Sequence, residues 1–482
     1  MIFNSFQFLY LFPIIFAIYY GVNYLSNYYS DKNNCNNTSR LSNYLLLVIS
    51  YLLYMQWNPA YTMILFGVTL CTYTAAIIIE KEQAYGKKKY IIYTGALLTL
   101  LPLIIFKYYD FIIQNFEQIF AYAGVTMGLK GLNWAIPIGL SFFTFQAIGY
   151  LWDVYYRKIR AEHNLIDYML FVAFFPQILS GPISKASSLL PQIKQKRSFD
   201  YNKAVIGLKY LLWGFFLKTV LADRLGIYVD TIYNNYEYYS GLTCFITSIF
   251  YSLQIYGDFA GYSLMAIGVG RLLGFDLINN FNRPYFSASI TEFWRRWHIS
   301  LSTWLKDYIY IPLGGSRCSK IRSYYNIVIT FLVSGIWHGA NWTFIIWGLI
   351  HGFIQIIEKL LNIQKCEKRG FIKVLRIITT FLIVNFAWIF FRMPTIESGF
   401  GVIKKIFTDF SSNIFVDAPN MAMIAVAVLI LFTKEFFEEY YPQITLFNNK
   451  HTIVRWITYL TITSLIIMLG VFDSTQFIYV NF

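Results

Sequence analysis

The residue best suited to do chemistry in this chain is a histidine inside a long apolar stretch. His338 lies in a tract from Ser323 to Ile357 that contains no Asp, Glu, Lys or Arg. An imidazole is expensive to place at membrane depth, so a histidine there is by default a candidate functional residue. Gly339 follows it and permits close approach of the backbone, which suits a substrate tunnel passing the ring. The sequence therefore predicts a reactive imidazole at His338.

A second histidine lies in a segment that mixes basic and aromatic side chains. Residues 292–322 hold six basic and two acidic side chains. The aromatic and apolar residues that recur there at helical spacing are Trp294, Trp297, Leu301 and Trp304. Arg295 and Lys306 share another face, so the pattern predicts one amphipathic helix, interfacial or re-entrant. His298 falls beside the aromatic face and should point inward, although a helix that merely lies on the leaflet is the alternative.

Composition indicates the class of protein that must position these residues. The chain is 57% apolar and 13% charged, whereas soluble proteins average about a quarter charged residues. An uncharged segment at 6–22 is long enough to span a membrane as a helix. Further uncharged stretches recur at about 43–57, 60–79, 90–106, 134–152, 168–184, 240–257, 259–270, 323–357, 377–391, 418–433 and 456–472. We predict an all-α polytopic membrane protein with about 11–13 transmembrane or re-entrant helices.

The basic residues predict an orientation in the membrane. The net charge is +14, and Lys and Arg cluster in short loops such as Lys87–Lys89 and Arg157–Arg160. Cytoplasmic loops carry the Lys and Arg excess, which places the N-terminus outside. The excess is explained by topology and anionic lipid, and we predict no nucleic-acid partner.

Several other residues and motifs give weaker evidence of function. His351 lies late in the same uncharged tract as His338, and we interpret it as a core histidine that donates to a backbone carbonyl. Asp258 either lines a cavity or pairs with Arg271. The chain has no phosphate-binding loop, no nucleophile elbow and no zinc-protease motif, and its scattered cysteines predict no metal site.

Two long motifs resemble the signatures of a known family. The runs Phe293–Gly315 and Ser334–Trp342 look like the two signatures of membrane-bound O-acyltransferases, in particular the bacterial alginate O-acetyltransferase type. Agreement extends to Gly139–Gln146, Phe174–Ile183 and Tyr256–Tyr262. The resemblance covers roughly residues 5–482, although the first 130 or so match only in hydropathy.

The resemblance implies a fold, an activity and partners. It implies one integral-membrane domain over 1–482, with helices arranged as a ring around a central tunnel. Within it, residues 1–130 would be peripheral helices, 131–357 the catalytic core and 358–482 the C-terminal helices. An acyl group, acetyl by expectation, would arrive on a cytoplasmic thioester of CoA or a carrier protein. It would leave toward a polysaccharide hydroxyl outside, through a periplasmic or surface-anchored esterase-like partner. No bound cofactor is expected, and the location implied is the bacterial cytoplasmic membrane.

The resemblance also assigns the site. His338 corresponds to the family's active-site histidine and His298 to a second histidine of this subgroup. A neutral imidazole can take the proton of an attacking hydroxyl, which typically contributes ~100- to 10,000-fold in rate. Burial keeps such an imidazole neutral and available.

The residues predicted to bind the donor or line the tunnel are Arg295, Arg296, Lys306, Asp307, Trp337, Asn341 and Trp342. The basic side chains suit donor phosphates, because guanidinium and ammonium groups pair well with phosphate. Trp337 and Trp342 would wall the tunnel against water, and Asn341 would orient the ring or hold the carbonyl oxygen.

Alternatives of two kinds stay open. Within the same chemistry, the acceptor is peptidoglycan, or the reaction is D-alanylation of teichoic acid. In another class, the chain is a polysaccharide or lipid transporter without acyl transfer, or a membrane scaffold. A transporter should show inverted repeats and broken helices at matching positions, and no such symmetry is detectable in the sequence.

Overall fold

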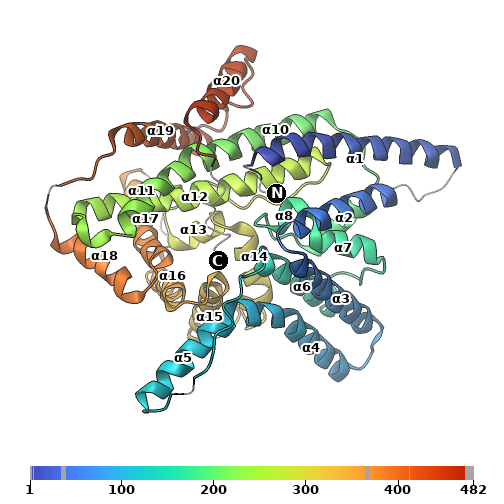
Figure 1. The fold of residues 1–482 in the computed structure, drawn as a ribbon, viewed down its shortest axis with the longest axis horizontal. Coiled ribbons are helices and arrows are strands. Elements are labelled where there is room, and N and C mark those ends of the chain that lie inside the picture. The colour runs from blue at the N-terminus through green and yellow to red at the C-terminus, as the bar shows by residue number, and fades with distance from the viewer. Residues whose placement is uncertain are drawn as a thin grey trace. The chain divides into compact units, whose positions relative to one another are not determined.

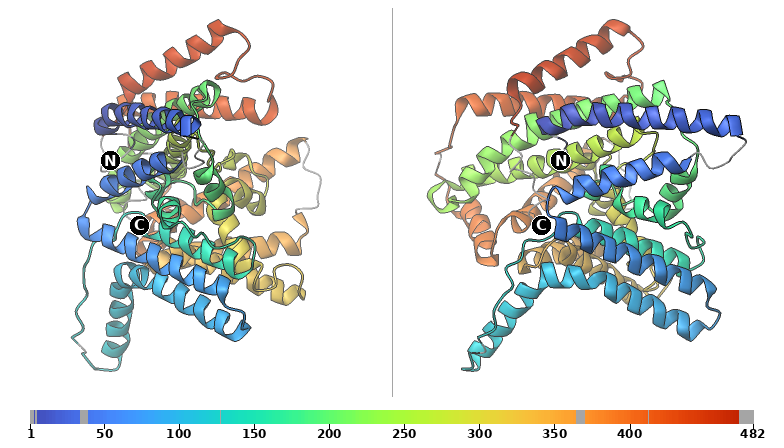
Figure 2. Two further views of the ribbon diagram at one scale, coloured as in Figure 1. Left: turned by 90° about the vertical axis from the view of Figure 1, so that its right-hand side faces the viewer. Right: turned by 45° about the vertical axis from the view of Figure 1, so that its right-hand side comes forward.

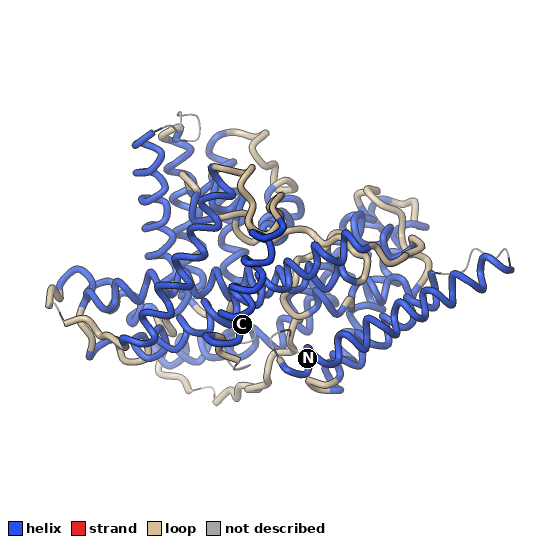
Figure 3. The backbone as a smooth tube through the Cα atoms, turned by 90° about the horizontal axis from the view of Figure 1, so that it is seen from above, coloured by secondary structure: helices blue, strands red, loops and turns tan. Residues whose placement is uncertain are grey.

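The described part of the chain is entirely helical. The computed structural model describes residue 3 and residues 5–33, 39–126, 128–363, 370–411 and 413–472. Within these ranges every regular element is a helix and no strand is present (Figure 3).

The chain divides into two compact units, whose helices are labelled in Figure 1. Unit 1 comprises Met1–Gly207 and Ala266–Ile278, and unit 2 comprises Leu208–Met265 and Asn279–Asn481. The predicted subdivision of a single domain near residues 130 and 357 stays a prediction.

The helices that begin in unit 1 are α1 (Phe6–Asn33), α2 (Ser39–Met55), α3 (Pro59–Lys81), α4 (Tyr85–Leu103), the π-helical η1 (Ile104–Tyr108), α5 (Tyr109–Tyr122), α6 (Leu140–Tyr155), α7 (Leu165–Ala173), α8 (Phe175–Ile178), α9 (Ala186–Lys194) and α10 (Tyr201–Phe215). Those that begin in unit 2 are η2 (Phe216–Ala222), α11 (Asp223–Tyr233), η3 (Tyr236–Tyr238), α12 (Gly241–Leu272), η4 (Pro284–Phe286), α13 (Ile290–Arg296), α14 (Ile299–Leu305), η5 (Lys306–Tyr310), α15 (Lys320–His338), α16 (Trp342–Leu360), α17 (Gly370–Arg392), α18 (Ile396–Thr408), α19 (Ala418–Tyr440) and α20 (Thr452–Leu469).

Many of these helices have the length and composition of membrane spans. Eight segments of the described chain qualify: Phe6–Tyr28, Pro59–Lys81, Tyr85–Tyr122, Tyr201–Tyr233, Trp342–Leu360, Gly370–Arg392, Ala418–Tyr440 and Thr452–Leu469. The last of them, α20, buries only 6% of its apolar window, and both views of Figure 2 show it (red) standing off from α19. The prediction of an all-α polytopic membrane protein is confirmed.

The eight candidate spans of the described residues are fewer than the 11–13 helices predicted, a number that also included re-entrant elements. The stretch 134–152 forms α6, and the stretches 240–257 and 259–270 together form α12, and neither helix is among the eight. The stretch 323–357 forms α15, which is not among them, and α16, which is. Two others form shorter apolar helices, Leu41–Met55 and Leu165–Ile178. The absence of charge therefore marks more helices than length and hydropathy together accept as spans.

The amphipathic helix predicted around residues 292–308 is broken in two. Helix α13 ends at Arg296 and α14 begins at Ile299, with His298 between them in the left-handed region (φ 43°). The prediction of one continuous helix is wrong, because helical spacing of apolar residues continues across the break. The predicted inward direction of His298 is confirmed, since its side chain is fully buried.

Asn280 explains why the chain can break there. Its carbonyl accepts from the Ile299 N–H (2.9 Å) and its side-chain oxygen accepts from the Ser300 N–H (3.2 Å). The first N–H groups of a helix have no partner within the helix. The loop that contains Asn280 thus accepts hydrogen bonds from the first N–H groups of α14. These bonds replace the helical hydrogen bonds that the break removes.

Helices α15 and α16 pack closely because glycines face the opposing backbone. A Cβ on Gly335 would lie 2.3 Å from the Phe344 carbonyl oxygen, and one on Gly348 would lie 2.4 Å from that of Phe331. Gly339 was expected to border a tunnel. Instead the Phe344 ring occupies the space beside it, 2.1 Å from where a Cβ would be.

The structure corrects the two options considered for Asp258. Its carboxylate lies 2.6 Å from the ammonium of Lys218, which also contacts Asp223 at 2.6 Å. All three side chains are buried. The ion-pair partner of Asp258 is therefore Lys218, and the cluster joins η2 to α12 inside unit 2.

A buried carboxylate on α16 holds α13 in place. The Glu358 side chain accepts from the N–H groups of Ile290 and Thr291 (3.1 Å for the latter) and from the Thr291 hydroxyl (3.0 Å). Ser289 caps the same helix by accepting from the Glu292 N–H. A seven-residue helix is too short to be stable alone, so these caps fix the position of α13 against α16.

Replacing Glu358 with Ala should therefore destabilise the protein by about 3 kcal/mol, because hydrogen bonds to a buried charged acceptor are lost. Thermal unfolding in detergent measures this loss. Glu397→Ala, at an exposed position on α18, is the matched control and should leave the midpoint unchanged. Equal midpoints for the two variants would contradict the role given to Glu358.

Candidate active site

His338 ends α15 and is enclosed by aromatic rings. Its side chain is 3% exposed. The ring centroid lies 4.8 Å from that of Trp337, 5.0 Å from Trp347 and 5.0 Å from Phe391. These rings come from α15, α16 and α17, so three helices build an apolar enclosure around one imidazole.

Trp337 links the two predicted histidines. Its ring lies 4.8 Å from His338 and 5.9 Å from His298. Phe259 of α12 packs against the other side of His298 at 4.5 Å. The structure thus brings His338, Trp337 and His298 together within unit 2, although they are separated by up to 40 positions in the sequence.

His298 is uncharged at neutral pH. It lies outside the eight candidate spans, and burial lowers the pKa of its imidazole from the ordinary 6.5 to about 3. A neutral ring offers one N–H donor and one acceptor nitrogen. His298 can therefore donate one hydrogen bond and accept another, but it cannot act as a fixed cation.

Unit 2 also contains a cavity of about 550 Å³, and His298, Trp337 and His338 are not among the residues that line it. Its wall includes three cationic side chains, Arg295, Lys306 and Lys359, and among the described residues that line it none is a carboxylate. Ser334 also lines it, and this residue lies one helical turn before His338 on the same face of α15. The cavity therefore combines a positive lining with a wall that leads to the buried imidazole.

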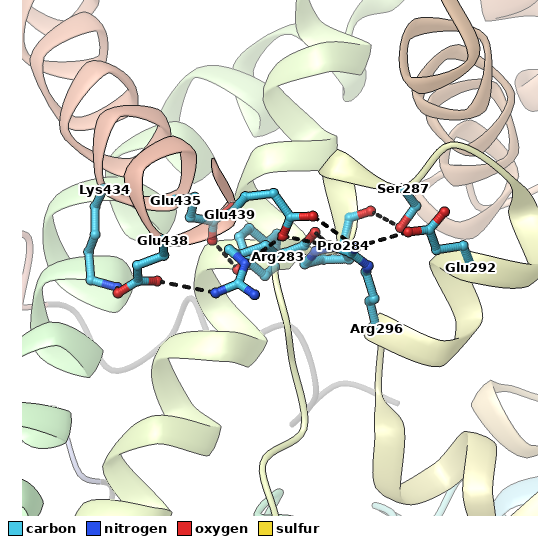
Figure 4. Close-up of polar contacts among 10 residues, drawn as sticks. Arg283, Pro284, Ser287, Glu292, Arg296, Lys434, Glu435, Glu438 and Glu439 are labelled. Carbon is cyan, nitrogen blue, oxygen red and sulfur yellow. Dashed lines mark hydrogen bonds and ion pairs between the residues drawn. The ribbon is translucent and has the colours of Figure 1, made fainter. Parts of the chain in front are cut away.

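Arg296 is directed elsewhere. Its guanidinium makes two hydrogen bonds of 2.9 Å to the carboxylate of Glu439 and a third of 2.9 Å to Glu292. Figure 4 shows Arg283 approaching the same Glu439, and its Nε lies 2.8 Å away. The structure thus separates Arg296 from Arg295, the neighbouring residue with which it was predicted to bind the donor.

Three further predicted residues, Asn341, Trp342 and Asp307, are not among the cavity-lining residues. Asn341 caps α16, accepting from the Thr343 N–H and donating to the Pro394 carbonyl, so both ends of its amide are engaged. Trp342 is half-exposed. Asp307 lies in η5 and is not among the cavity-lining residues.

His351 differs from its predicted role. It was interpreted as a core histidine that donates to a backbone carbonyl. It is fully buried, but within the described residues neither ring nitrogen has a hydrogen-bond partner. That interpretation is therefore wrong, and the unsatisfied ring requires another explanation.

Four residues of the site were missed from the sequence. Ser334, Gln355 and Lys359 line the cavity, and Glu358 caps α13. The available signal was the Glu358–Lys359 pair, the first charged residues after the uncharged tract. Charges at the end of an apolar helix are common, so this signal alone does not reveal a site.

The fold and this site define a multi-pass membrane protein with a buried imidazole next to a cationic cavity. The chain matches the membrane-bound O-acyltransferase family over residues 51–399. It belongs to that family and is accordingly an enzyme of the O-acyltransferase class.

Relatives with assigned names cover most of the chain. A probable alginate O-acetylase of Pseudomonas aeruginosa is 37% identical over 371 residues, which is 77% of this chain and 70% of the relative. A peptidoglycan O-acetyltransferase of Helicobacter pylori is 36% identical over 387 residues, 74% of this chain and 72% of the relative. A teichoic acid D-alanyltransferase of Bacillus subtilis is 25% identical over 311 residues, 60% and 74% of the two chains.

The pKa of His298 predicts how stability depends on pH. Because its pKa is lowered on folding, the unfolded chain takes up a proton between about pH 6.5 and pH 3 while the folded chain does not. Stability should fall as the pH falls through this window, by at most about 1.4 kcal/mol per pH unit from this residue. Unfolding midpoints measured from about pH 7 down to about pH 4, which covers most of this window, give the slope.

The matched comparison is His298→Gln, which cannot titrate and should have a shallower slope than the unchanged protein. Identical slopes would mean that His298 takes up its proton equally well in the folded and unfolded chains. His451→Gln, at an exposed position, controls for loss of a histidine as such.

Proposed function

We propose that the protein moves an acetyl group from a cytoplasmic thioester donor across the membrane for O-acetylation of an extracellular or periplasmic polysaccharide. The observation that carries this proposal is the buried His338, one helical turn from Ser334 in the wall of the cationic cavity. The identity of 37% to a probable alginate O-acetylase supports the acetyl group and the polysaccharide.

The cavity supports an anionic, phosphate-bearing donor. Arg295, Lys306 and Lys359 line it, and charge-assisted hydrogen bonds from such groups bind phosphate well. Acetyl-CoA, or an acetylated carrier protein, brings phosphate and a thioester on one arm. We leave Arg296 and Asp307 out of this donor site, because Arg296 is paired with Glu439 and Asp307 is not in the wall.

The chemistry assigned to His338 is that of a general base. Its neutral ring takes the proton of the acceptor hydroxyl as the oxygen attacks the thioester carbonyl. The carbon–sulfur bond breaks, an ester forms, and the thiolate recovers the proton as free thiol. The enclosing Trp337, Trp347 and Phe391 rings exclude water that would otherwise hydrolyse the thioester. His298 positions the donor or relays the proton.

The setting is the bacterial cytoplasmic membrane, with the N-terminus outside and the basic loops inside. On this orientation the acetyl group leaves toward a periplasmic or surface-anchored esterase-like protein, which passes it to the polysaccharide. A second candidate acceptor is peptidoglycan, which the 36% identity to a peptidoglycan O-acetyltransferase favours almost equally.

Replacing His338 with Ala should abolish O-acetylation, with a loss of at least about 100-fold, because the general base is removed. Ester-linked acetate released from isolated polysaccharide and from isolated peptidoglycan measures this, and also tells the two acceptors apart. His451→Ala is the control. Normal acetylation by a folded His338→Ala protein would contradict the assignment of His338 as the general base.

Replacing Arg295 and Lys306 with Gln should raise the KM for the donor by about tenfold each, because each change removes a charged contact to phosphate. Initial rates at varied acetyl-CoA in membranes measure the effect. Arg322→Gln, at an exposed position outside the cavity, should leave the KM unchanged. If both cavity variants keep the donor KM of the unchanged protein, this cavity is not the donor site.

A further inference from the structure

A third imidazole lies directly behind the wall of the cavity. His351 is on α16 and is 0% exposed. Its ring centroid lies 5.0 Å from that of Trp294 and 6.2 Å from that of Phe331. Both of these rings also line the cavity. Two aromatic side chains therefore separate the cavity from His351.

The same imidazole is connected to His338. Trp347 lies 5.1 Å from His351 and 5.0 Å from His338, so one indole contacts both rings. One chain of ring contacts thus runs from the cavity wall through His351 and Trp347 to His338. Gln355, one turn after His351 on α16, lines the cavity as well.

His351 and three further buried polar groups have no hydrogen-bond partner among the described residues. A neutral imidazole always presents one N–H and one bare nitrogen. Within the described residues, neither nitrogen of His351 has a partner, and the same holds for the buried indole nitrogens of Trp294 and Trp347 and the hydroxyl of Ser334. Buried polar groups in native proteins are nearly always hydrogen-bonded, so four such groups in one place require an explanation.

These groups share a chemical character. Each indole is a donor only, while the imidazole and the hydroxyl each carry a hydrogen that can be donated. A cluster of this kind is complementary to carbonyl oxygens, which accept and do not donate. Amide and thioester carbonyls are the acceptors along the arm that carries an acyl group on CoA or on a carrier protein.

We propose that His351, with the Trp294 indole and the Ser334 hydroxyl, binds the carbonyl groups of the acyl-donor arm and holds the thioester toward His338. The proposal rests on the proposed function, because it assigns the deep part of the same donor site. The cations at the cavity bind the phosphate end, and the donor cluster binds the arm. Entry of the arm displaces the Phe331 ring, since this ring stands between the cavity and His351.

An apolar replacement distinguishes a histidine that only fills space from one that binds the donor. If His351 only fills space, its replacement should leave donor binding unchanged. Phe has a ring of similar shape and needs no hydrogen bond, so it should suit an aromatic enclosure at least as well as an unsatisfied imidazole. If His351 is retained for function, His351→Phe should keep or raise the unfolding midpoint while weakening donor binding. Stability and function then move in different directions, as is usual for binding residues.

The test measures binding of two probes to full-length protein in detergent, with His338→Ala as background so that the donor is not consumed. The probes are acetyl-CoA and S-acetylpantetheine, which has the arm and thioester but no phosphate. Adding His351→Phe should weaken both about tenfold, the equivalent of one hydrogen bond. Adding Arg295→Gln should weaken acetyl-CoA only. His451→Phe is the matched control and should change neither.

Two further variants guard against misfolding. Ser334→Ala removes one hydroxyl with little change in packing and should weaken both probes severalfold. His351→Gln restores a donor and an acceptor, and should recover part of the binding that His351→Phe loses. This recovery is not expected if the residue only fills space.

Unchanged binding of both probes to folded His351→Phe protein would overturn this inference and leave the proposed function intact. Failure of both probes to bind the protein with His351 present would overturn the thioester donor, and the inference with it. Weakening of acetyl-CoA alone by His351→Phe would also overturn the inference, because the arm would then not be what His351 contacts.

Discussion

The arrangement of the site depends on one buried carboxylate. Glu358, at the end of α16, accepts hydrogen bonds from the start of α13. Helix α13 carries Arg295 and Trp294, whereas α16 carries His351 and the Trp347 ring that contacts His338. A seven-residue helix with no tie to its neighbour would not keep its cation at a fixed distance from an imidazole on another helix. The cap therefore sets the geometry between the charged and the aromatic parts of the site.

The two arginines that precede the break at His298 have different partners. Consecutive residues of a helix point about 100° apart, so Arg295 and Arg296 cannot serve the same surface. Arg295 lines the cavity, while Arg296 holds α13 to α19 through Glu439. Lys306 lies after the break, at the start of η5, and lines the same cavity as Arg295. Two cations eleven positions apart reach one cavity from two separate helices.

The sequence predicted the parts of the site that depend on local composition. His338 and the helical membrane fold follow from an uncharged tract with few ionisable groups, because burial of such groups is costly wherever the tract packs. Arg295 and Lys306 were found together because their spacing places them on one face. The pairing of Arg296 could not be predicted, since Glu439 is 143 positions away. The break at His298 was hidden because Asn280, outside the helix, supplies the acceptors that make it possible.

The unsatisfied His351 belongs to a different category, because no local pattern distinguishes it from a satisfied core histidine. Its state depends on which groups α13, α15, α16 and α17 bring around it, and those groups are indole and phenyl rings. Gly335 and Gly348 draw α15 and α16 together so closely that backbone carbonyls of one helix meet the backbone of the other. Such packing leaves little freedom for the ring to turn toward an acceptor within the protein. An enclosure that keeps an imidazole dry, and offers it no internal partner, keeps its hydrogen-bonding capacity for whatever enters from the cavity.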